Sequence, residues 1–163
     1  MSKASVRKGK QAERELANRI QSELKEQFGK EVRVRRTLDQ TRDGGFDLDG
    51  IPFLAIEVKR HETLKINTWW AQTREQAKAQ SRIPVLAYRQ SRKDWRFILP
   101  LSCFDEGMFA RHMSGDFDYY GPDFKVEIDV DSFVLVCYDN LIMKERAAEA
   151  RKEFEKETGE YMQ

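Results

Sequence analysis

The sequence predicts an α/β (α+β) domain in which a mixed central β-sheet is flanked by helices. Helical periodicity marks two segments and strand-like runs mark the others, in the order αβββαββ. A helical crossover between strands is typical of a mixed sheet with helices packed on it. At 163 residues the chain suits one domain, residues 1–163, with a core at about 6–101 and an acidic C-terminal extension at 102–163.

The first part of the chain supplies the elements of this core. Leu16, Ile20 and Leu24 recur at helical spacing and predict an amphipathic helix from about Val6 to Phe28. The core should continue with strands near 31–36, 46–49, 53–60, 83–90 and 94–102, and with a helix at 67–80 between the third and fourth of these strands.

The C-terminal part is less regular. Residues 103–124 show no clear period and are expected to form a loop-rich insertion. The apolar run in 125–138 should add one or two strands. Residues 141–163 are expected to form a highly charged helix with few apolar anchors, which would pack loosely or against another chain.

The net charge of +1 hides an asymmetry along the chain. Residues 1–100 contain 22 Lys and Arg against 13 Asp and Glu, whereas residues 101–163 contain 7 against 15. A basic N-terminal portion indicates a polyanion such as nucleic acid as the partner. A chance fluctuation of surface charge is the alternative explanation.

No membrane or secretory segment is expected. No apolar run approaches 18 residues, and the basic N-terminus is not followed by an apolar stretch. Cys103 and Cys137 lie far apart in apolar stretches, which favours reduced thiols over a disulfide. We therefore expect a cytoplasmic protein without a membrane partner.

The run FLAIEVK at 53–59 carries two charges inside the most strand-like segment of the chain. Because side chains alternate along a strand, Glu57 and Lys59 share one face and are neighbours. A solvated ion pair on the open face of an edge strand is one explanation. The other explanation is a functional site that needs both charges.

Glu13 raises the same question on the first helix. It lies three residues before Leu16 and seven before Ile20, and therefore on the core face of that helix. Arg14 and Glu15 point elsewhere and are expected to be ordinary solvated charges. A carboxylate on a core face is a candidate for chemistry.

Asp47 makes the strand charges a candidate metal site. An acid, a gap of nine residues and then Glu-x-Lys is a pattern of divalent-cation sites on a β-hairpin, and magnesium prefers carboxylate oxygens. The two acids can reach one ion only if they lie nearly opposite each other. That requires a turn centred on Pro52, which pairs Leu48 with Ile56 and Asp47 with Glu57. A tight two-residue turn earlier in the loop would put Asp47 on the opposite face.

The chemistry of such a site would be phosphodiester hydrolysis. A lysine beside a divalent ion can position the attacking water or stabilise the charge that develops on a phosphate. Lys59 fits that role, and Glu13, brought from the helix, would add a third carboxylate.

The segments RKGKQAERELANRI, DGGFDL and AIEVKR together resemble the archaeal-type Holliday junction resolvases and their phage relatives, within the PD-(D/E)XK nuclease superfamily. The resemblance covers roughly residues 7–101 and extends to TREQAKAQ on the second helix. Phe46 stands where the usual motif has proline. The resemblance implies a single nuclease domain with an αβββαβ core and a C-terminal strand and helix extension, in a prokaryotic or phage-infected cell.

The resemblance also implies the roles of the site residues. Its metal ligands are matched by Glu13, Asp47, Glu57 and Val58, and its catalytic residues by Glu13, Asp47, Glu57, Lys59 and Gln76. The implied cofactor is Mg²⁺, for which Mn²⁺ would substitute. The implied partners are DNA, as four-way junctions or other branched DNA, and a second copy of the chain in a homodimer that makes paired, symmetric nicks.

Basic residues near this site are expected to contact DNA phosphates, which position the substrate without specifying its sequence. Trp69 and Trp70 could stack on unpaired bases or fill a core or a dimer interface, and the dimer interface is the favoured location. Strand 94–102 and apolar positions of the last helix, such as Phe154, would complete that interface. The expected phosphate contacts are Arg7, Lys8, Lys10, Arg35, Arg36, Arg42 and Arg60.

Two alternatives to a resolvase stay open. The first is a nuclease of the same fold that acts on other DNA, in degradation, repair or cleavage of flaps. The second is a non-catalytic DNA-binding or scaffold protein of this fold. The second alternative is weaker, because such a protein is expected to lack at least one of the four key residues Glu13, Asp47, Glu57 and Lys59, and all four are present.

Overall fold

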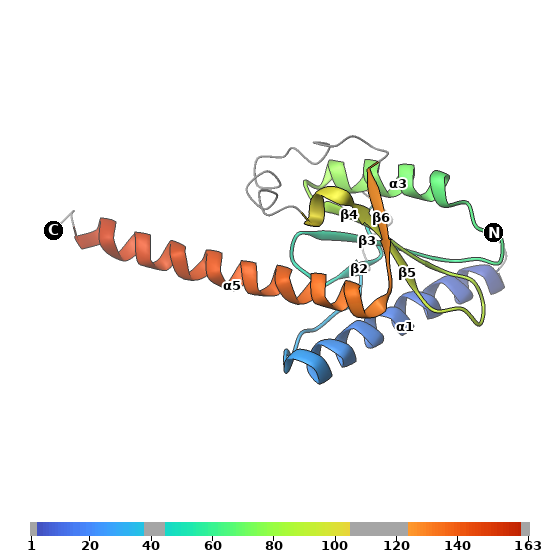
Figure 1. Cartoon of the computed structure of the whole chain (residues 1–163), viewed down its shortest axis with the longest axis horizontal. Coiled ribbons are helices and arrows are strands. Elements are labelled where there is room, and N and C mark those ends of the chain that lie inside the picture. The colour runs from blue at the N-terminus through green and yellow to red at the C-terminus, as the bar shows by residue number, and fades with distance from the viewer. Residues whose placement is uncertain (1–2, 38–44, 105–123, 161–163) are drawn as a thin grey trace.

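The structure is a computed structural model that describes residues 3–37, 45–104 and 124–160. Its elements follow the predicted order of the core (Figure 1). The predicted loop-rich segment 103–124 and Arg42 lie wholly or largely outside the described residues. The elements are α1 (Lys3–Phe28), β1 (Arg35–Arg36), β2 (Leu48–Asp49), β3 (Leu54–Arg60), α3 (Ile66–Ala79), β4 (Ile83–Arg89), β5 (Arg96–Pro100), η1 (Leu101–Phe104), β6 (Lys125–Ile128) and α5 (Val130–Glu160).

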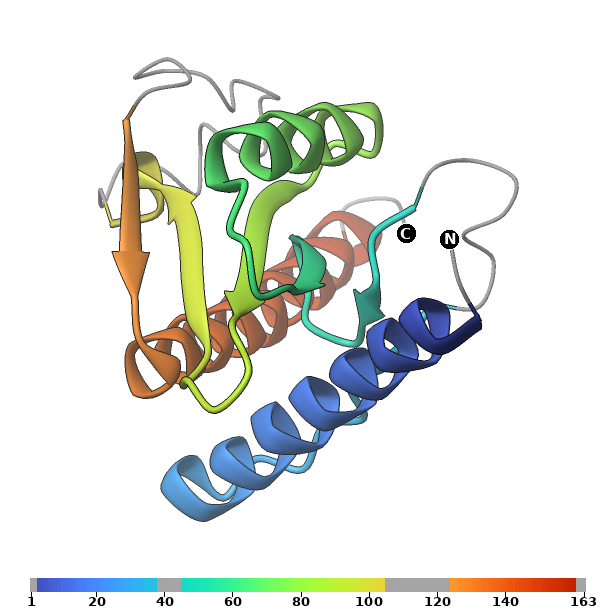
Figure 2. The same ribbon diagram turned by 90° about the vertical axis from the view of Figure 1, so that its right-hand side faces the viewer.

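In the described part of the chain the strands form one six-stranded sheet in the order β1-β2-β3-β4-β5-β6. β3 and β4 are parallel and are connected through α3, whereas the other neighbours are antiparallel. Helix α3 covers one face of the sheet, and α1 with the first part of α5 covers the other (Figures 1 and 2). This is the predicted mixed sheet flanked by helices.

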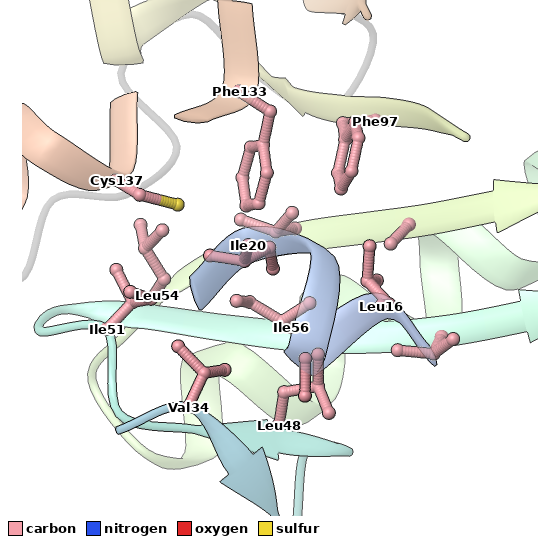
Figure 3. Close-up of a cluster of buried hydrophobic side chains, with 14 of the residues drawn as sticks. Leu16, Ile20, Val34, Leu48, Ile51, Leu54, Ile56, Phe97, Phe133 and Cys137 are labelled. Atoms are coloured by element: carbon pink, nitrogen blue, oxygen red, sulfur yellow. The ribbon is translucent and has the colours of Figure 1, made fainter. Parts of the chain in front are cut away.

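The larger core lies between the sheet and the pair α1 and α5 (Figure 3). Leu16 of α1 and Ile56 of β3 are buried there. Phe133 of α5 stacks on Phe97 of β5 with ring centroids 4.0 Å apart. Burial of such aromatic and aliphatic side chains is the main stabilising term of the fold. It also fixes α1, and with α1 the acidic residues on its core face.

The smaller core lies under α3, and it corrects the expected dimer interface. Trp69 and Trp70 are buried against Leu86, Tyr88 and Ile98 of β4 and β5. They are therefore core residues and not interface residues. The same holds for β5, because it lies inside the sheet between β4 and β6. Both adjacent tryptophans are buried because α3 lies over β4 and β5.

The hairpin between β2 and β3 has the register that the metal hypothesis requires. Leu48 pairs with Ile56, so the connection is centred on Pro52. Gly50 lies in this turn with φ +118°, a conformation that residues with a side chain rarely adopt. A Cβ at this glycine would overlap the Arg33 carbonyl oxygen and lie 2.9 Å from the Val34 Cα. The turn is thus packed directly against the segment that leads into β1.

Segment 125–138 differs from its prediction. Only the first four residues form a strand, β6, and the apolar run FVLVCY is helical. Asp129 starts the helix, because its Oδ1 accepts the Ser132 N–H at 2.9 Å. Phe133, Val134 and Cys137 are then spaced as one buried helical face. The β-branched residues are compatible with a strand, but the capping aspartate and this spacing favour the helix.

The predicted charged helix at the C-terminus is the continuation of α5. After Ile142 and Met143, which are half-buried, every described side chain from Lys144 to Lys156 is exposed. This part of α5 extends away from the sheet (Figure 1). Of the apolar side chains of the expected dimer interface, Phe154, at 66% exposed, is the most exposed in the described residues, and Leu101 is 40% exposed.

Two smaller expectations concern the whole chain. None of the described helices combines the length and apolar character that crossing a bilayer needs. Cys103 and Cys137 are both free thiols, as predicted. Burial raises the pKa of the Cys137 thiol, so that it stays protonated and unreactive at neutral pH.

The turn of the hairpin can be tested by stability. Gly50→Ala should lower the free energy of unfolding by at least about 2 kcal/mol, because the added Cβ combines backbone strain with overlap. Gly45→Ala is the control, since its Cβ would meet only Gln80 Nε2 at 3.7 Å, and it should change stability by less than about 1 kcal/mol. Urea unfolding measures both. Equal stability of the two variants would contradict the close approach of the turn to Arg33.

Candidate active site

Glu57 and Lys59 lie side by side on β3, as the alternation of the strand predicts. Lys59 Nζ donates to Glu57 Oε1 at 2.5 Å. β3 is an interior strand between β2 and β4, and Glu57 is 6% exposed. The alternative of a solvated ion pair on an edge strand is therefore wrong. A buried carboxylate is costly unless it is paired, and Lys59 supplies the pairing charge.

Asp47 is fixed to β3 by two hydrogen bonds. Its N–H donates to the Ile56 carbonyl at 2.9 Å, and its Oδ2 accepts the Val58 N–H at 2.7 Å. These two bonds are to the residues on either side of Glu57, so Asp47 lies beside Glu57 along β3. At 8% exposed, its carboxylate is held where the two strands meet. The two acids of the motif are thus brought together by backbone pairing.

Val58 can contribute to a metal site only through its backbone. Its side chain is buried in the core on the α1 side of the sheet, away from the face of Glu57. Its N–H is already donated to Asp47. Its carbonyl oxygen is the one atom of the residue with the chemistry of a metal ligand.

Glu13 is on the core face of α1, as predicted, and is nearly buried. Its Oε2 accepts a hydrogen bond from the Arg36 Nε of β1. Across the described residues, no three His, Cys, Asp or Glu side chains converge closely enough to hold a metal ion. The structure therefore brings Asp47 and Glu57 together but does not bring Glu13 into one cluster with them.

The residues present nevertheless fit a hydrated magnesium ion. Mg²⁺ keeps several waters and is often bound through only one or two protein carboxylates. Asp47 and Glu57 supply these from adjacent strands, and the carbonyl of Val58 supplies a further oxygen. Oxygen ligands of this kind also suit Mn²⁺.

Gln76 lies on the helix that covers the Glu57 face of the sheet. α3 packs there through Ala77, which contacts Ala55 of β3. Gln76 itself is half-buried, and its Oε1 has no hydrogen-bond partner in the described part of the chain. A buried acceptor without a donor is unusual and is available to a water or substrate group.

The predicted phosphate contacts on α1 differ in how far they are engaged by other residues of the protein. Arg7 and Lys10, on the first turns of α1, are exposed and make no ion pair with another described residue. Lys8 donates to Glu62 Oε1 at 3.0 Å. A hydrogen bond from Ser91, together with Lys8, lowers the pKa of Glu62 to about 2. Lys8 is thus partly engaged within the protein, whereas its two neighbours are open to a ligand.

The arginines of the sheet are engaged to different degrees. Arg35 is exposed and lies 3.7 Å from Asp49 Oδ2. Arg36 is mostly buried against Glu13. Arg60 is directed to Glu15, with Nη1 3.8 Å from Oε2. Of the three, Arg35 is the most open to a phosphate.

Glu15 is not the solvated charge that the sequence suggested. Its Oε2 accepts a 2.6 Å hydrogen bond from Arg89, in addition to the contact with Arg60. The two arginines are partners at the ends of β3 and β4, and Arg89 also stacks over Trp95 at 4.9 Å. The sequence shows that β3 ends in Arg60 and β4 in Arg89. The parallel register of the two strands is what places these arginines side by side.

The bond between Asp47 and Val58 gives a prediction that is independent of activity. Asp47→Ala should lower the free energy of unfolding by about 1–3 kcal/mol, because the Val58 N–H loses its acceptor. Asp47→Asn keeps an oxygen acceptor and should lose clearly less. Asp49→Ala is the control, because this half-buried carboxylate has only a long, 3.7 Å contact with the exposed Arg35, and it should change stability by less than about 0.5 kcal/mol. Denaturant unfolding measures the stability of the three variants. An Asp47→Ala protein as stable as the native protein would contradict the hydrogen bond between Asp47 and Val58.

Comparison with known proteins shows the family. A family model described as "Phage putative PDDEXK endonuclease" matches residues 4–149. No curated protein matches the sequence. Among solved structures, the chain is similar to Hjc, a Holliday junction resolvase of Archaeoglobus fulgidus, with 19% identity, a TM-score of 0.41, and coverage of 78% of this chain and 88% of that chain. The family model spans both strands of the hairpin and its acidic residues, and the chain belongs to this family of phage PDDEXK endonucleases.

Proposed function

We propose that the protein is a magnesium-dependent DNA endonuclease that hydrolyses phosphodiester bonds at Asp47, Glu57 and Lys59. The observation that carries the proposal is that Asp47 is hydrogen-bonded to the residues on either side of Glu57, while Glu57 has Lys59 beside it. A buried carboxylate pair next to a cation is a poor way to stabilise a fold. It is a good way to bind an ion and a phosphate.

Each side chain has a role that follows from its surroundings. When bound, Mg²⁺ would polarise the phosphate and acidify a bound water. Asp47 is oriented by the Val58 N–H, and Glu57 is paired with Lys59. The lysine ammonium, at the exposed end of the pair, can stabilise charge on the phosphate. Gln76 offers its unpaired Oε1 to the attacking water.

The substrate we propose is branched DNA, in particular four-way junctions, cut by a homodimer. The support is the resemblance of RKGKQAERELANRI, DGGFDL and AIEVKR to the junction resolvases. Two strands of a junction must be nicked at equivalent places, which a twofold dimer with two sites can do. Arg7 and Lys10 on α1 and the exposed Arg35 would contact phosphates.

A related nuclease that acts on linear DNA or flaps is the second candidate, since the family name specifies no DNA structure. A non-catalytic protein is disfavoured for a physical reason. Without a ligand to bind, two buried acids beside each other would be a disadvantage, because apolar residues at positions 47 and 57 would stabilise the sheet more.

The test is cleavage of a labelled four-way junction, a flap and a linear duplex of the same sequence, with Mg²⁺ or with EDTA. We expect nicking only with Mg²⁺, and a loss of about 10² or more in rate for Lys59→Ala and Glu57→Gln. We also expect preference for the junction over the duplex by at least a factor of about ten. Lys93→Ala, an exposed residue in the β4–β5 turn, is the control for loss of a surface charge.

The outcomes test the nuclease site and the preference for four-way junctions separately. Full activity of Lys59→Ala and Glu57→Gln, both correctly folded, would contradict the assignment of the site. Equal cleavage of junction and duplex by a protein that is monomeric by light scattering would contradict the resolvase and leave the second candidate.

A further inference from the structure

Glu13 is engaged by a cation in the DNA-free protein. The Arg36 Nε donates to its Oε2, and the two side chains are only 16% and 12% exposed. Glu13 comes from α1 and Arg36 from β1, so the pair joins two elements across the side of the sheet next to β2. The shielding from water makes this pair stronger than the ion pairs on the surface of the protein.

This pairing opposes the binding of a metal ion by Glu13. A divalent cation at this carboxylate would be repelled by the adjacent guanidinium. Removing Arg36 from the pair without giving it another anion would leave a mostly buried charge unpaired, which is strongly unfavourable. Glu13 can therefore serve a metal only when Arg36 has a different anionic partner.

The position of Arg36 indicates what that partner is. Its strand pairs with β2, where it lies opposite Leu48, and the next residue, Thr37, donates its N–H to the Asp47 carbonyl at 2.9 Å. Arg36 is thus one residue from the backbone that carries Asp47. A DNA phosphate bound at the site proposed above could accept its guanidinium bidentately.

We infer that Arg36 couples DNA binding to metal binding. In the DNA-free protein it holds Glu13; when DNA is bound, a phosphate takes the guanidinium and the Glu13 carboxylate becomes available to the ion. This rests on the proposed function, and it deepens it by assigning a regulation of the same site. Coupling of this kind is reciprocal, so the metal must raise the affinity for DNA by the same factor that DNA raises the affinity for the metal.

The chain offers a matched control in the adjacent residue. Arg35 is on the same strand and carries the same charge, but its side chain is 63% exposed and lies 3.7 Å from Asp49. Because neighbouring residues of a strand point to opposite faces, it cannot reach Glu13. Arg35→Gln therefore removes one positive charge without freeing the carboxylate.

The first measurement is Mg²⁺ affinity of the DNA-free protein by isothermal titration calorimetry. Arg36→Gln should bind Mg²⁺ at least about tenfold more tightly than the native protein, whereas Arg35→Gln should change the affinity by less than about twofold. In a Glu13→Gln background, Arg36→Gln should bring no gain, because the carboxylate it would free is absent. Arg36→Lys, which keeps the charge but not the forked donor, should show a smaller gain and serves if Arg36→Gln does not fold.

The second measurement is the coupling itself. With Lys59→Ala in every protein to prevent cleavage, Mg²⁺ should raise the affinity for a four-way junction, and Arg36→Gln should reduce that factor to near one. Unchanged or weaker Mg²⁺ binding by a folded Arg36→Gln or Arg36→Lys protein would overturn the inference. The Mg²⁺ titration contains no DNA, so this result is separate from any failure of the protein to cleave.

Discussion

The pairing of β2 with β3 is the constraint on which the rest of the site depends. Leu48 lies opposite Ile56, and the turn between them is centred on Pro52. Because side chains alternate along a strand, a slip of one residue would move Asp47 to the other face and bury the wrong side chains. Gly50 favours this register, because the turn is packed against Arg33 and only glycine fits at that position.

The fold accommodates a set of buried charges by giving each a specific partner. Glu57 has Lys59, Glu13 has Arg36, and Asp47 has the Val58 N–H. On the other side of α1, Glu15 receives both Arg60 and Arg89. Polar burial of this extent contributes little net stability. The stability comes from the two apolar layers, which hold α1, the hairpin and α3 around the charges.

Local periodicity explains what could be predicted. Alternation in FLAIEVK is enough to pair Glu57 with Lys59, and the 3.6-residue period of α1 is enough to put Glu13 on its core face. The register could be stated only as a condition of metal binding, and the structure has the Leu48–Ile56 pair of that condition. These features depend on residues close together in the sequence.

Features that depend on distant contacts could not be predicted in the same way. The burial of Trp69 and Trp70 requires β4 and β5 to lie beneath α3, and the ion pairs of Glu15 require the parallel register of β3 with β4. The partner of Glu13 was equally hidden, because Arg36 lies 23 residues away and is one of several arginines in its segment. The helical form of FVLVCY depends on one capping aspartate.

The central claim is that Asp47 and Glu57 together bind a divalent ion. The most direct measurement is the crystal structure of the protein grown with Mn²⁺ and a DNA junction, with the ion located by its anomalous scattering. We expect one strong peak about 2 Å from carboxylate oxygens of both residues. A well-occupied peak that neither carboxylate contacts would contradict a metal site at Asp47 and Glu57.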